Sequence, residues 1–286
     1  MKSPILSVLM TSYNRQSFIA EAIESVQQSS FQEWELIIVD DGSTDETVNI
    51  AKWYAAADHR ISVYINKQNL GDYPNRNRAA SYAKGKYLMY VDSDDKILTD
   101  GFSDCIAAME AFPEAGIGMQ LHENKTSFPF YLPAEQALRR HFFEKSCLTI
   151  GPGGTILRRD FFEQIGKYPE LYGPANDMYF NLKAVAAGGV LFLPFNFNFY
   201  RIHEGQEINN KYSYLYNNFN YLRDALGQLE LPLTSSEKEW LLNKNRRRFL
   251  VNLVRYLKIT LNADKAMAAR RMAEFGFKDF IKALLH

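Results

Sequence analysis

The chain has 286 residues, and its 33 lysines and arginines are balanced by 33 aspartates and glutamates, so its formal net charge is zero. A chain of this length can bury a core without disulfide or metal staples. Its composition, 47% hydrophobic and 23% charged, excludes a disordered or fibrous protein. Zero net charge argues against a chain that binds nucleic acid as a whole. The two cysteines, Cys105 and Cys147, match no metal spacing or disulfide framework, and we expect both to be reduced packing residues.

The first residues and the apolar runs bear on where the protein works. Residues 1–4 lead straight into a strand-like segment, without the apolar region of a signal peptide. No uninterrupted apolar run approaches the ~20 residues of a membrane span. We therefore expect a cytoplasmic protein, with peripheral contact at the inner face of the plasma membrane as the closest approach to a bilayer.

Short apolar runs alternate with helix-like stretches in the first part of the chain. The predicted strands are residues 5–10, 36–39, 61–65 and 87–91. The predicted helices are residues 18–26 and 75–83, with a third between them that Thr44 or Asp45 caps and that runs through Val48, Ala51 and Lys52. This alternation predicts an α/β fold with a mostly parallel sheet and helices on both faces. Right-handed crossovers then bring the strand ends after Met10, Val39 and Val91 to one edge, where open sheets bind ligands.

The pattern is looser beyond Leu121. The sequence predicts helices at 138–143, 161–165 and 177–187, a glycine-rich loop at 151–154, a strand at 155–157, an aromatic strand at 190–200, and mainly helix from 205. Leu250, Val254, Leu257 and Leu261 fall on one stripe of the last part.

The zero net charge hides an asymmetry between this last part and the rest. Residues 244–282 carry 11 basic and 3 acidic side chains, a net of +8, so the remainder has a net charge of −8. Three uses of the basic end are open: packing of its apolar stripe on the body, which we favour, an oligomer interface, or contact with an anionic membrane surface.

Two aspartates, Asp92 and Asp94, follow the strand predicted at 87–91 and are separated only by Ser93. On a tight turn, two such carboxylates can bracket a divalent cation. Mg²⁺ and Mn²⁺ favour oxygen ligands that are completed by water and substrate phosphates. Taken alone, however, this triplet is more often a solvated turn.

Polar residues also follow the first two predicted strands. In Asp40-Asp41-Gly42-Ser43 a carboxylate can accept the imide N–H of uracil or hold a ribose hydroxyl, although such residues are common in ordinary strand-to-helix turns. Thr11-Ser12-Tyr13-Asn14 offers a ring that can stack on a base and hydroxyls for ribose or phosphate. A plain polar loop is the alternative for the second tetrapeptide.

These motifs occur in one order along the chain, together with Asn69-Leu70-Gly71, Arg76-Asn77-Arg78-Ala79 and Ala83-Lys84-Gly85-Lys86-Tyr87. In this combination they closely resemble the nucleotide-sugar half of family 2 glycosyltransferases with the GT-A fold. The resemblance extends over roughly residues 4–203. It implies a Rossmann-like, mostly parallel sheet flanked by helices: a GT-A domain over 1–204, with a nucleotide-sugar half (1–95) and an acceptor half (96–204), and a basic helical extension over 205–286.

The resemblance assigns roles at the nucleoside end of the donor. Thr11 and Tyr13 line the nucleoside pocket, and Asp41 binds the uracil ring. Asp40 supports the same loop. A UDP-sugar is therefore the first donor to expect.

It also assigns roles at the diphosphate. Arg76 lies near the nucleotide or pyrophosphate with Asn77 beside it. Asp92 and Asp94 form the DxD element, in which Asp92 lies towards the ribose, Ser93 belongs to the nucleotide-sugar contacts, and Asp94 binds the Mg²⁺ or Mn²⁺ that bridges the diphosphate.

The second half resembles the family less tightly. Gly153-Gly154 before Thr155 resembles the acceptor-side loop, and Asp177 stands where the family has its general base. Asn176 replaces the usual neighbouring acid, which removes a flanking charge and lowers the pKa of Asp177 relative to an acid pair. A helix N-cap is the structural alternative for Asp177, and both roles can coexist.

Arg201-Ile202-His203 follows the aromatic strand and resembles the family's Arg-x-His element. That element reaches back to the diphosphate or the metal, so the resemblance makes His203 a metal or phosphate contact. A lone histidine is otherwise more often a satisfied structural residue.

The implied reaction is an inverting transfer of a sugar to an acceptor hydroxyl on a glycan or a lipid-linked molecule, in polysaccharide, lipopolysaccharide or capsule biosynthesis. Two alternatives stay open: a non-catalytic protein that binds sugar nucleotides or glycans on the same fold, and a sugar nucleotidyltransferase. The latter needs a glycine-rich loop with basic residues after the first strand, which Thr11-Ser12-Tyr13-Asn14 does not provide. Phosphate-loop, dinucleotide and Gly-x-Ser-x-Gly motifs are also missing from the sequence.

Overall fold

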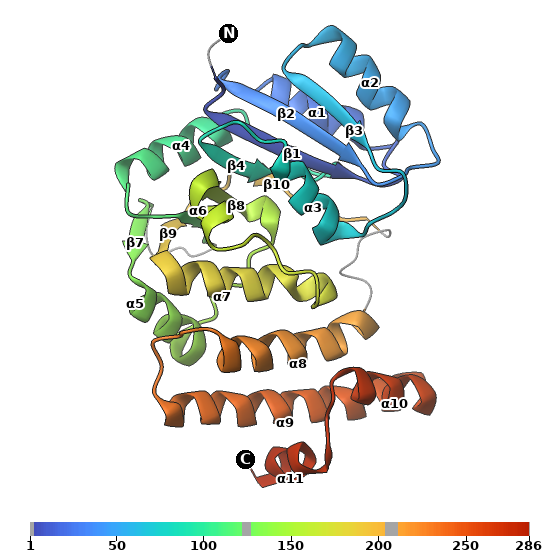
Figure 1. Ribbon diagram of the computed structural model, residues 1–286, viewed down its shortest axis with the longest axis vertical. Helices are drawn as coiled ribbons and strands as arrows, with labels where there is room; N and C mark the ends of the chain where they lie inside the picture. The colour runs from blue at the N-terminus through green and yellow to red at the C-terminus, as the bar shows by residue number, and fades with distance from the viewer. Residues whose placement is uncertain (1–2, 122–126, 204–210, 286) are drawn as a thin grey trace.

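A central sheet of eight strands organises the computed structural model, which describes residues 3–121, 127–203 and 211–285 (Figure 1). The strand order is β3-β2-β1-β4-β8-β6-β9-β7. The strands are β1 (Leu6–Ser12), β2 (Trp34–Asp40), β3 (Ile61–Ile65), β4 (Tyr87–Tyr90), β6 (Ile117–Gln120), β7 (Phe130–Leu132), β8 (Thr155–Arg158) and β9 (Val190–Leu193). Two further strands, β5 (Lys96–Ile97) and β10 (Asn198–Phe199), pair with each other in an antiparallel ribbon.

The sheet is parallel in its first half and mixed in its second. β1 pairs in parallel with both β2 and β4, and β2 pairs in parallel with β3. β8 lies between β4 and β6 and runs antiparallel to both. β9 runs parallel to β6 and antiparallel to β7. The expected mostly parallel sheet is thus found over the first four predicted strands, which all lie where the sequence places them.

Helices cover both faces of this sheet, as predicted. They are α1 (Ile19–Gln27), α2 (Thr47–Ala57), α3 (Asp72–Ser81), α4 (Gly101–Ala111), α5 (Ala134–Arg139), α6 (Arg159–Gln164), α7 (Asn176–Gly188), α8 (Lys211–Gln228), α9 (Ser235–Thr260), α10 (Ala263–Met272) and α11 (Phe277–Leu285). Strand side chains alternate between two cores, because successive residues of a strand point to opposite faces. Leu9 packs in the core with α3, α6 and α7, whereas Val8 and Met10 pack in the core with α1, α2 and α4.

Two differences from the predicted elements have local causes. The aromatic segment 190–200 is two strands in different sheets rather than one, because β9 ends before Pro194, which has no N–H to donate. α2 begins at Thr47, and its first turn is held by Asp45, whose Oδ1 accepts the Thr47 N–H at 3.0 Å.

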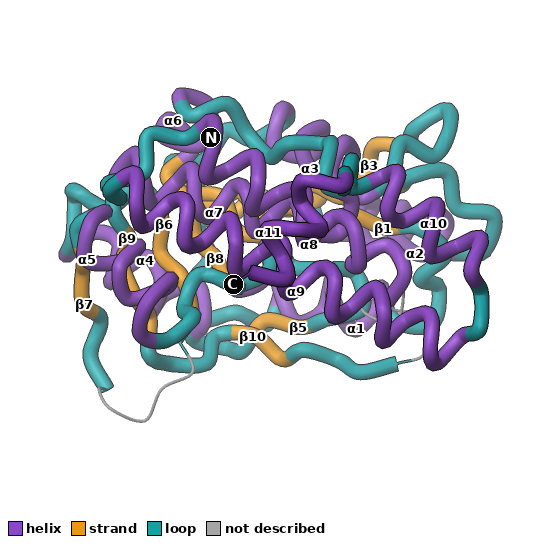
Figure 2. Tube along the Cα trace, turned by 90° about the horizontal axis from the view of Figure 1, so that it is seen from below, coloured by secondary structure: helices purple, strands orange, loops and turns teal. Residues whose placement is uncertain are grey.

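The C-terminal part is helical, as expected, and stacks in layers below the sheet (Figures 1 and 2). α8 packs into the core that contains α7, through Leu222 and Leu226 among others. A capping box starts α9, because Thr234 Oγ1 accepts the Glu237 N–H and the Glu237 carboxylate accepts the Thr234 N–H. The predicted boundary between two domains at residue 204 stays a prediction. α8, which follows this boundary, packs in the same hydrophobic core as α7, which precedes it.

The predicted packing of the C-terminal apolar stripe on the body is wrong. Leu250 is partly buried, but Val254, Leu257 and Leu261 are exposed. α9 instead buries a different stripe that contains Leu241 and Phe249. A helix places residues 100° apart, so the stripe that reaches α8 is rotated from the predicted one. None of the helices in the described ranges is long and apolar enough to cross a bilayer.

A substitution at Gly85 tests how closely the chain before β4 packs against β1. A Cβ at this position would lie 2.6 Å from the Ser7 backbone nitrogen and 2.8 Å from the Leu6 carbonyl carbon. Because backbone atoms cannot yield, we expect Gly85→Ala to lower the free energy of unfolding by about 2 kcal/mol or more, measured by urea denaturation. Gly227→Ala in α8 is the control: nothing lies within 4 Å of its Cβ, so we expect no loss of stability. Equal stability of both variants would contradict this packing.

Candidate functional site

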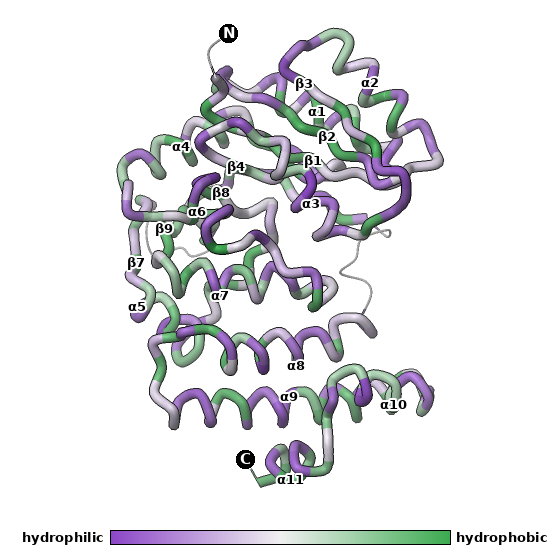
Figure 3. The backbone as a smooth tube through the Cα atoms, viewed as in Figure 1, coloured by the Kyte–Doolittle hydropathy of each residue, from purple (hydrophilic) through white to green (hydrophobic). Residues whose placement is uncertain are grey.

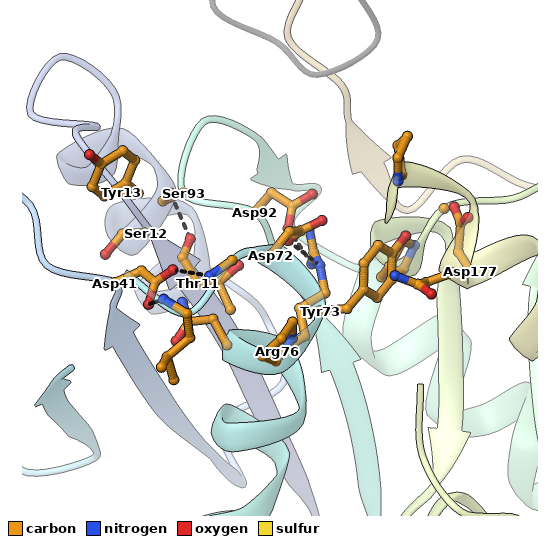
Figure 4. A pocket seen from close by; sticks show the side chains of 18 of the residues that line it. Thr11, Ser12, Tyr13, Asp41, Asp72, Tyr73, Arg76, Asp92, Ser93 and Asp177 are labelled. Carbon is orange, nitrogen blue, oxygen red and sulfur yellow. Dashed lines mark hydrogen bonds and ion pairs between the residues drawn. The ribbon is translucent and has the colours of Figure 1, made fainter. Parts of the chain in front are cut away.

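A cavity of about 840 Å³ lies at the carboxyl ends of β1, β2 and β4. Its wall includes Thr11 after β1, Asp41 after β2 and Asp92 after β4, as the sheet-edge argument predicts. The remaining wall comes from the start of α3, the loop at Gly151 and Pro152, and the starts of α7 and α8. Figure 4 shows Tyr13 and Asp41 at one end of this cavity and Asp177 at the other.

Asp41 is buried at one end of the cavity and is held by one side-chain amide and two backbone amides. Its Oδ1 accepts hydrogen bonds from Asn66 Nδ2 at 2.7 Å and from the Leu70 N–H at 2.8 Å. Its Oδ2 accepts the Gly71 N–H at 2.9 Å. A carboxylate has about four acceptor positions, so these three bonds leave room for one further donor. The Asn69-Leu70-Gly71 motif therefore serves to orient Asp41.

Asp40 fixes the loop that follows β2. Its Oδ1 accepts the N–H groups of Gly42 and Ser43, and its Oδ2 accepts the hydroxyls of Ser12 and Ser43. Gly42 has φ +84°, a backbone conformation that favours glycine. This network orders the loops after β1 and β2 against each other, and Thr11 and Tyr13 line the cavity from the first of them.

Arg76 lines the middle of the cavity, between Asp41 and Asp177. This buried guanidinium donates from Nε to Asp72 Oδ1 at 2.8 Å and from one terminal nitrogen to Asp92 Oδ1 at 2.7 Å. Tyr73, from the same helix, lies between Arg76 and Asp177 in Figure 4. Arg76 therefore sets the position of Asp92, the first acid of the DxD element, from below.

Asp94 lies between two side chains that are distant in sequence. Its Oδ2 is 3.0 Å from Arg15 Nε and 2.9 Å from His203 Nε2. The His203 ring stacks on Phe18, with 4.8 Å between ring centroids. Within the described ranges, no three histidine, cysteine, aspartate or glutamate side chains are arranged to hold a metal ion. A carboxylate and an imidazole at this spacing nevertheless fit an ion that takes its other ligands from phosphate and water.

Arg201 ties the end of β4 to the chain after β10. Its N–H donates to Asp95 Oδ1 at 2.9 Å and its Nε donates to the Asp94 carbonyl at 3.0 Å. A terminal nitrogen reaches Glu21 Oε2 at 2.8 Å. Burial raises the pKa of Asp95 to about 7. Arg201 thus holds the DxD turn against the segment that carries His203.

Asp177 is a buried carboxylate in the second residue of α7. Its Oδ1 accepts the Met178 N–H at 2.8 Å, and burial raises its pKa to about 7. The N-cap position of α7 is occupied by Ala175, so Asp177 lies inside the helix instead of capping it. A carboxylate with a pKa near neutrality can exchange a proton at the pH where the protein works.

Two of the predicted nucleotide-sugar residues have other partners. Ser93 lines the cavity, but its hydroxyl donates to the Thr11 carbonyl at 2.8 Å, which joins the ends of β1 and β4. Asn77 does not line the cavity. Its amide donates to the Tyr168 carbonyl and accepts the Tyr168 N–H, so it anchors the loop before α7. The Asn77 side chain thus faces the protein in this structure, and its expected place beside the nucleotide stays a prediction.

Residues 7–166, more than half of the chain, match the sequence model of Glycosyl transferase family 2. The chain belongs to this family. Over 93 residues it is 43% identical to the putative teichuronic acid biosynthesis glycosyltransferase TuaG of Bacillus subtilis, covering 32% of this chain and 37% of that protein. It is 26% identical to the uncharacterized glycosyltransferase MJ1057 of Methanocaldococcus jannaschii over 88% of this chain and 84% of that protein.

Solved structures establish the GT-A fold. S. aureus TarS 1–349 in complex with UDP-GlcNAc superposes with a TM-score of 0.72 at 21% identity, over 97% of this chain and 81% of that chain. The mannosyltransferase PcManGT of Pyrobaculum calidifontis, in complex with GDP-Man and Mn²⁺, gives 0.65 at 14% identity over 100% and 87%. The expected fold class, a large α/β sheet flanked by helices with helices at the C-terminus, is confirmed.

Asn176 closes the turn before α7 with both polar atoms of its side-chain amide. Its Oδ1 accepts the Tyr172 N–H at 2.9 Å, while its Nδ2 donates to the Gly173 carbonyl at 2.7 Å. Only a side chain with both an acceptor and a donor can close this turn, and an ionised acid has no donor. The turn leads directly into Asp177. Asn176 therefore orders the backbone that carries the buried carboxylate.

Sequence reasoning missed several residues of the cavity wall. They include Arg15, Asp72, Tyr73, Asp95, Glu170 and Tyr200. The ion pair between Asp72 and Arg76 could have been predicted from the sequence, because opposite charges four residues apart pair on a helix. The pairing of Arg15 with Asp94 carried no local signal, since 79 residues separate the two.

The role of Asn176 can be measured by replacing it with the family's acid. We expect Asn176→Asp to lower the free energy of unfolding by about 1–3 kcal/mol at pH 8, because the Gly173 carbonyl loses its donor and a second charge enters beside Asp177. Asn252→Asp, on the exposed surface of α9, is the control, with an expected change within about 0.5 kcal/mol. Unchanged stability of Asn176→Asp in urea titrations would refute this role.

Proposed function

We propose that this protein transfers a sugar, with inversion, from a UDP-sugar to the hydroxyl of a glycan or lipid-linked acceptor on the cytoplasmic side of the membrane. One observation carries the proposal. A single cavity holds the nucleotide-binding motifs at one end and a buried carboxylate with a pKa of about 7, Asp177, at the other.

The nucleoside end supports a uridine donor. Asp41 keeps an acceptor position after its three amide bonds, which suits the imide N–H of uracil. Tyr13 is half-exposed at the cavity and offers a ring for stacking on the base, and Thr11 offers a hydroxyl. TarS, with the same fold, is described in complex with UDP-GlcNAc and with UDP.

The middle of the cavity supports a diphosphate with a divalent ion. Asp94 and His203 would hold Mn²⁺ or Mg²⁺, with Asp92 towards the ribose. When bound, such an ion supplies Lewis-acid stabilisation of the charge on the departing diphosphate. PcManGT is described with Mn²⁺. Arg15, paired with Asp94, and Arg76, paired with Asp92, are cations of the cavity wall that would face the expected phosphates.

The other end supports the base. Asp177 would take the proton of the acceptor hydroxyl while that oxygen bonds to the anomeric carbon and the bond from this carbon to the diphosphate breaks. Base and leaving group then lie on opposite sides of the sugar, which gives inversion. Burial of Asp177 keeps its pKa close to neutrality, where a general base is effective.

The acceptor side of the wall comes from Glu170 and Tyr200 and from the first turn of α8. Two relatives that match about a third of this chain are named for glycan assembly. They are TuaG, named for teichuronic acid biosynthesis, and a Campylobacter jejuni β-1,3-glucosyltransferase named for an undecaprenol-linked acceptor, 33% identical over 101 residues. Only 37% and 33% of these two proteins are covered. We infer a role in polysaccharide, lipopolysaccharide or capsule biosynthesis.

Asp177→Asn tests the base. We expect turnover to fall by about a hundredfold or more while donor binding is unchanged, because the amide cannot take the proton. In the native protein, transfer should fall as pH drops below about 7, since the base must be ionised. Both are measured by UDP release with an acceptor, and donor binding by calorimetry. Near-native turnover in Asp177→Asn would refute the assignment.

Asp94→Ala tests the ion site. We expect it to abolish the part of UDP binding that depends on Mn²⁺, as measured by calorimetry with and without the ion, because the carboxylate ligand is lost. Asp104→Ala, an exposed acid of α4, is the matched control and should bind as the native chain does. Retained Mn²⁺-dependent binding in Asp94→Ala would contradict the site. A native chain that binds UDP-sugars but never releases UDP would instead be a non-catalytic sugar-nucleotide binder.

A further inference from the structure

The last helix, α11, carries its large apolar side chains on the outside of the molecule. Phe277, Phe280, Ile281, Leu284 and Leu285 are between 41 and 76% exposed. Their spacing of three or four residues puts them on one side of a helix, which we call the α11 face. Contiguous exposed apolar patches of this kind mark interaction sites in globular proteins.

The opposite side of α11 is the one that packs on the protein. Within this helix only Ala283 is buried. The partly buried Asp279 accepts a hydrogen bond from Arg246 Nε of α9 at 2.8 Å. α11 is thus attached to α9 through a small residue and two ion pairs, Arg246–Asp279 and Lys282–Glu239, while its large apolar residues are exposed. A surface helix normally has the reverse orientation, with its apolar stripe towards the core.

Two lysines flank this face on α11, and further basic residues lie on the exposed surface of α9. Lys278 and Lys282 lie on one flank of α11, where Lys282 also reaches Glu239 of α9 at 2.9 Å. On α9, the exposed Lys244, Arg255 and Lys258 alternate with exposed Val251 and Val254. Residues 244–282 contain 11 basic residues and only three acidic ones. An apolar face flanked by lysine and arginine is the pattern of helices that lie in a bilayer interface.

The position of α11 leaves this face accessible. α9, α10 and α11 form the outermost layer, at the end of the molecule farthest from β1, β2 and β3 (Figures 1 and 2). Figure 3 shows apolar residues recurring along α11 in this layer.

We propose that the α11 face docks on the surface of an anionic lipid bilayer. Phenylalanine and leucine side chains enter the interfacial region, and the flanking basic residues contact acidic headgroups. Charge favours a bilayer over a second copy of the chain. A two-fold interface would place this patch against itself, so its excess of positive charge would repel the same excess on the partner.

Vesicle co-sedimentation of the full chain tests the proposal without using transfer activity. We expect the chain to pellet with vesicles of phosphatidylglycerol and phosphatidylcholine in equal parts, not with phosphatidylcholine alone, and to be partly released by high salt. Phe280→Ser/Leu284→Ser should bind about tenfold more weakly. Trp53→Ser, which removes an exposed apolar residue of α2, is the control and should bind as the native chain does.

Two results would overturn the proposal. One is a native chain that stays in the supernatant with the anionic vesicles, or a double variant that pellets as the native chain does. The other is a dimer in sedimentation velocity that Phe280→Ser/Leu284→Ser abolishes, which would assign the face to a second copy. Circular dichroism of the double variant, expected to match the native chain, establishes that lost binding does not come from unfolding.

Discussion

The buried guanidinium of Arg76 is the interaction on which the site depends. The sheet edge collects the carboxylates of Asp92, Asp94 and Asp95 on one short turn, and such a cluster is unstable unless cations face it. Arg76 forms an ion pair with Asp92, and Arg15 forms one with Asp94. Arg201 donates a hydrogen bond to the Asp94 carbonyl. Removing one partner of a buried ion pair leaves an uncompensated charge, which is more costly than the pair itself is stabilising. The acids of the DxD element are therefore kept in place by this chain's own cations.

Asp177 differs from these acids, because burial, and not a neighbouring cation, has the largest effect on its pKa. Its pKa of about 7 lies above the usual aspartate value near 4. The folded chain then holds this proton to higher pH than the unfolded chain, so the free energy of unfolding falls as pH rises from about 4 to about 7. The ionised base therefore lowers stability in the pH range in which it is useful. The turn closed by Asn176 offsets part of that cost locally, which fits a neutral side chain at this position better than a second acid.

Much of the first half could be predicted because its signals are local. Apolar runs that end abruptly in Asp40-Asp41 and in Asp92-Ser93-Asp94 fix both the strand and its carboxyl end. The rest depends on contacts between distant residues. Nothing near Arg201 indicates that it meets Asp95, 106 residues earlier. The insertion of β8 between β4 and β6 likewise has no local signal. Asn77 shows the converse: Arg76 beside it lines the cavity, but a helix turns each residue by 100°, so the Asn77 side chain points to the Tyr168 loop.

The zero net charge is the sum of an acidic part and a basic part that lie in different regions of the molecule. The part of the chain with the net charge of −8 includes the acids at the sheet edge, Asp41, Asp92 and Asp94 among them. Residues 244–282, with the net charge of +8, lie in the outermost helical layer. Part of that positive charge is used internally, since Arg246 pairs with Asp279 and thereby attaches α11. This attachment decides which side of α11 is exposed. Had the helix packed through its phenylalanines, no apolar face would remain, so the ion pairs Arg246–Asp279 and Lys282–Glu239, together with the buried Ala283, orient the last helix.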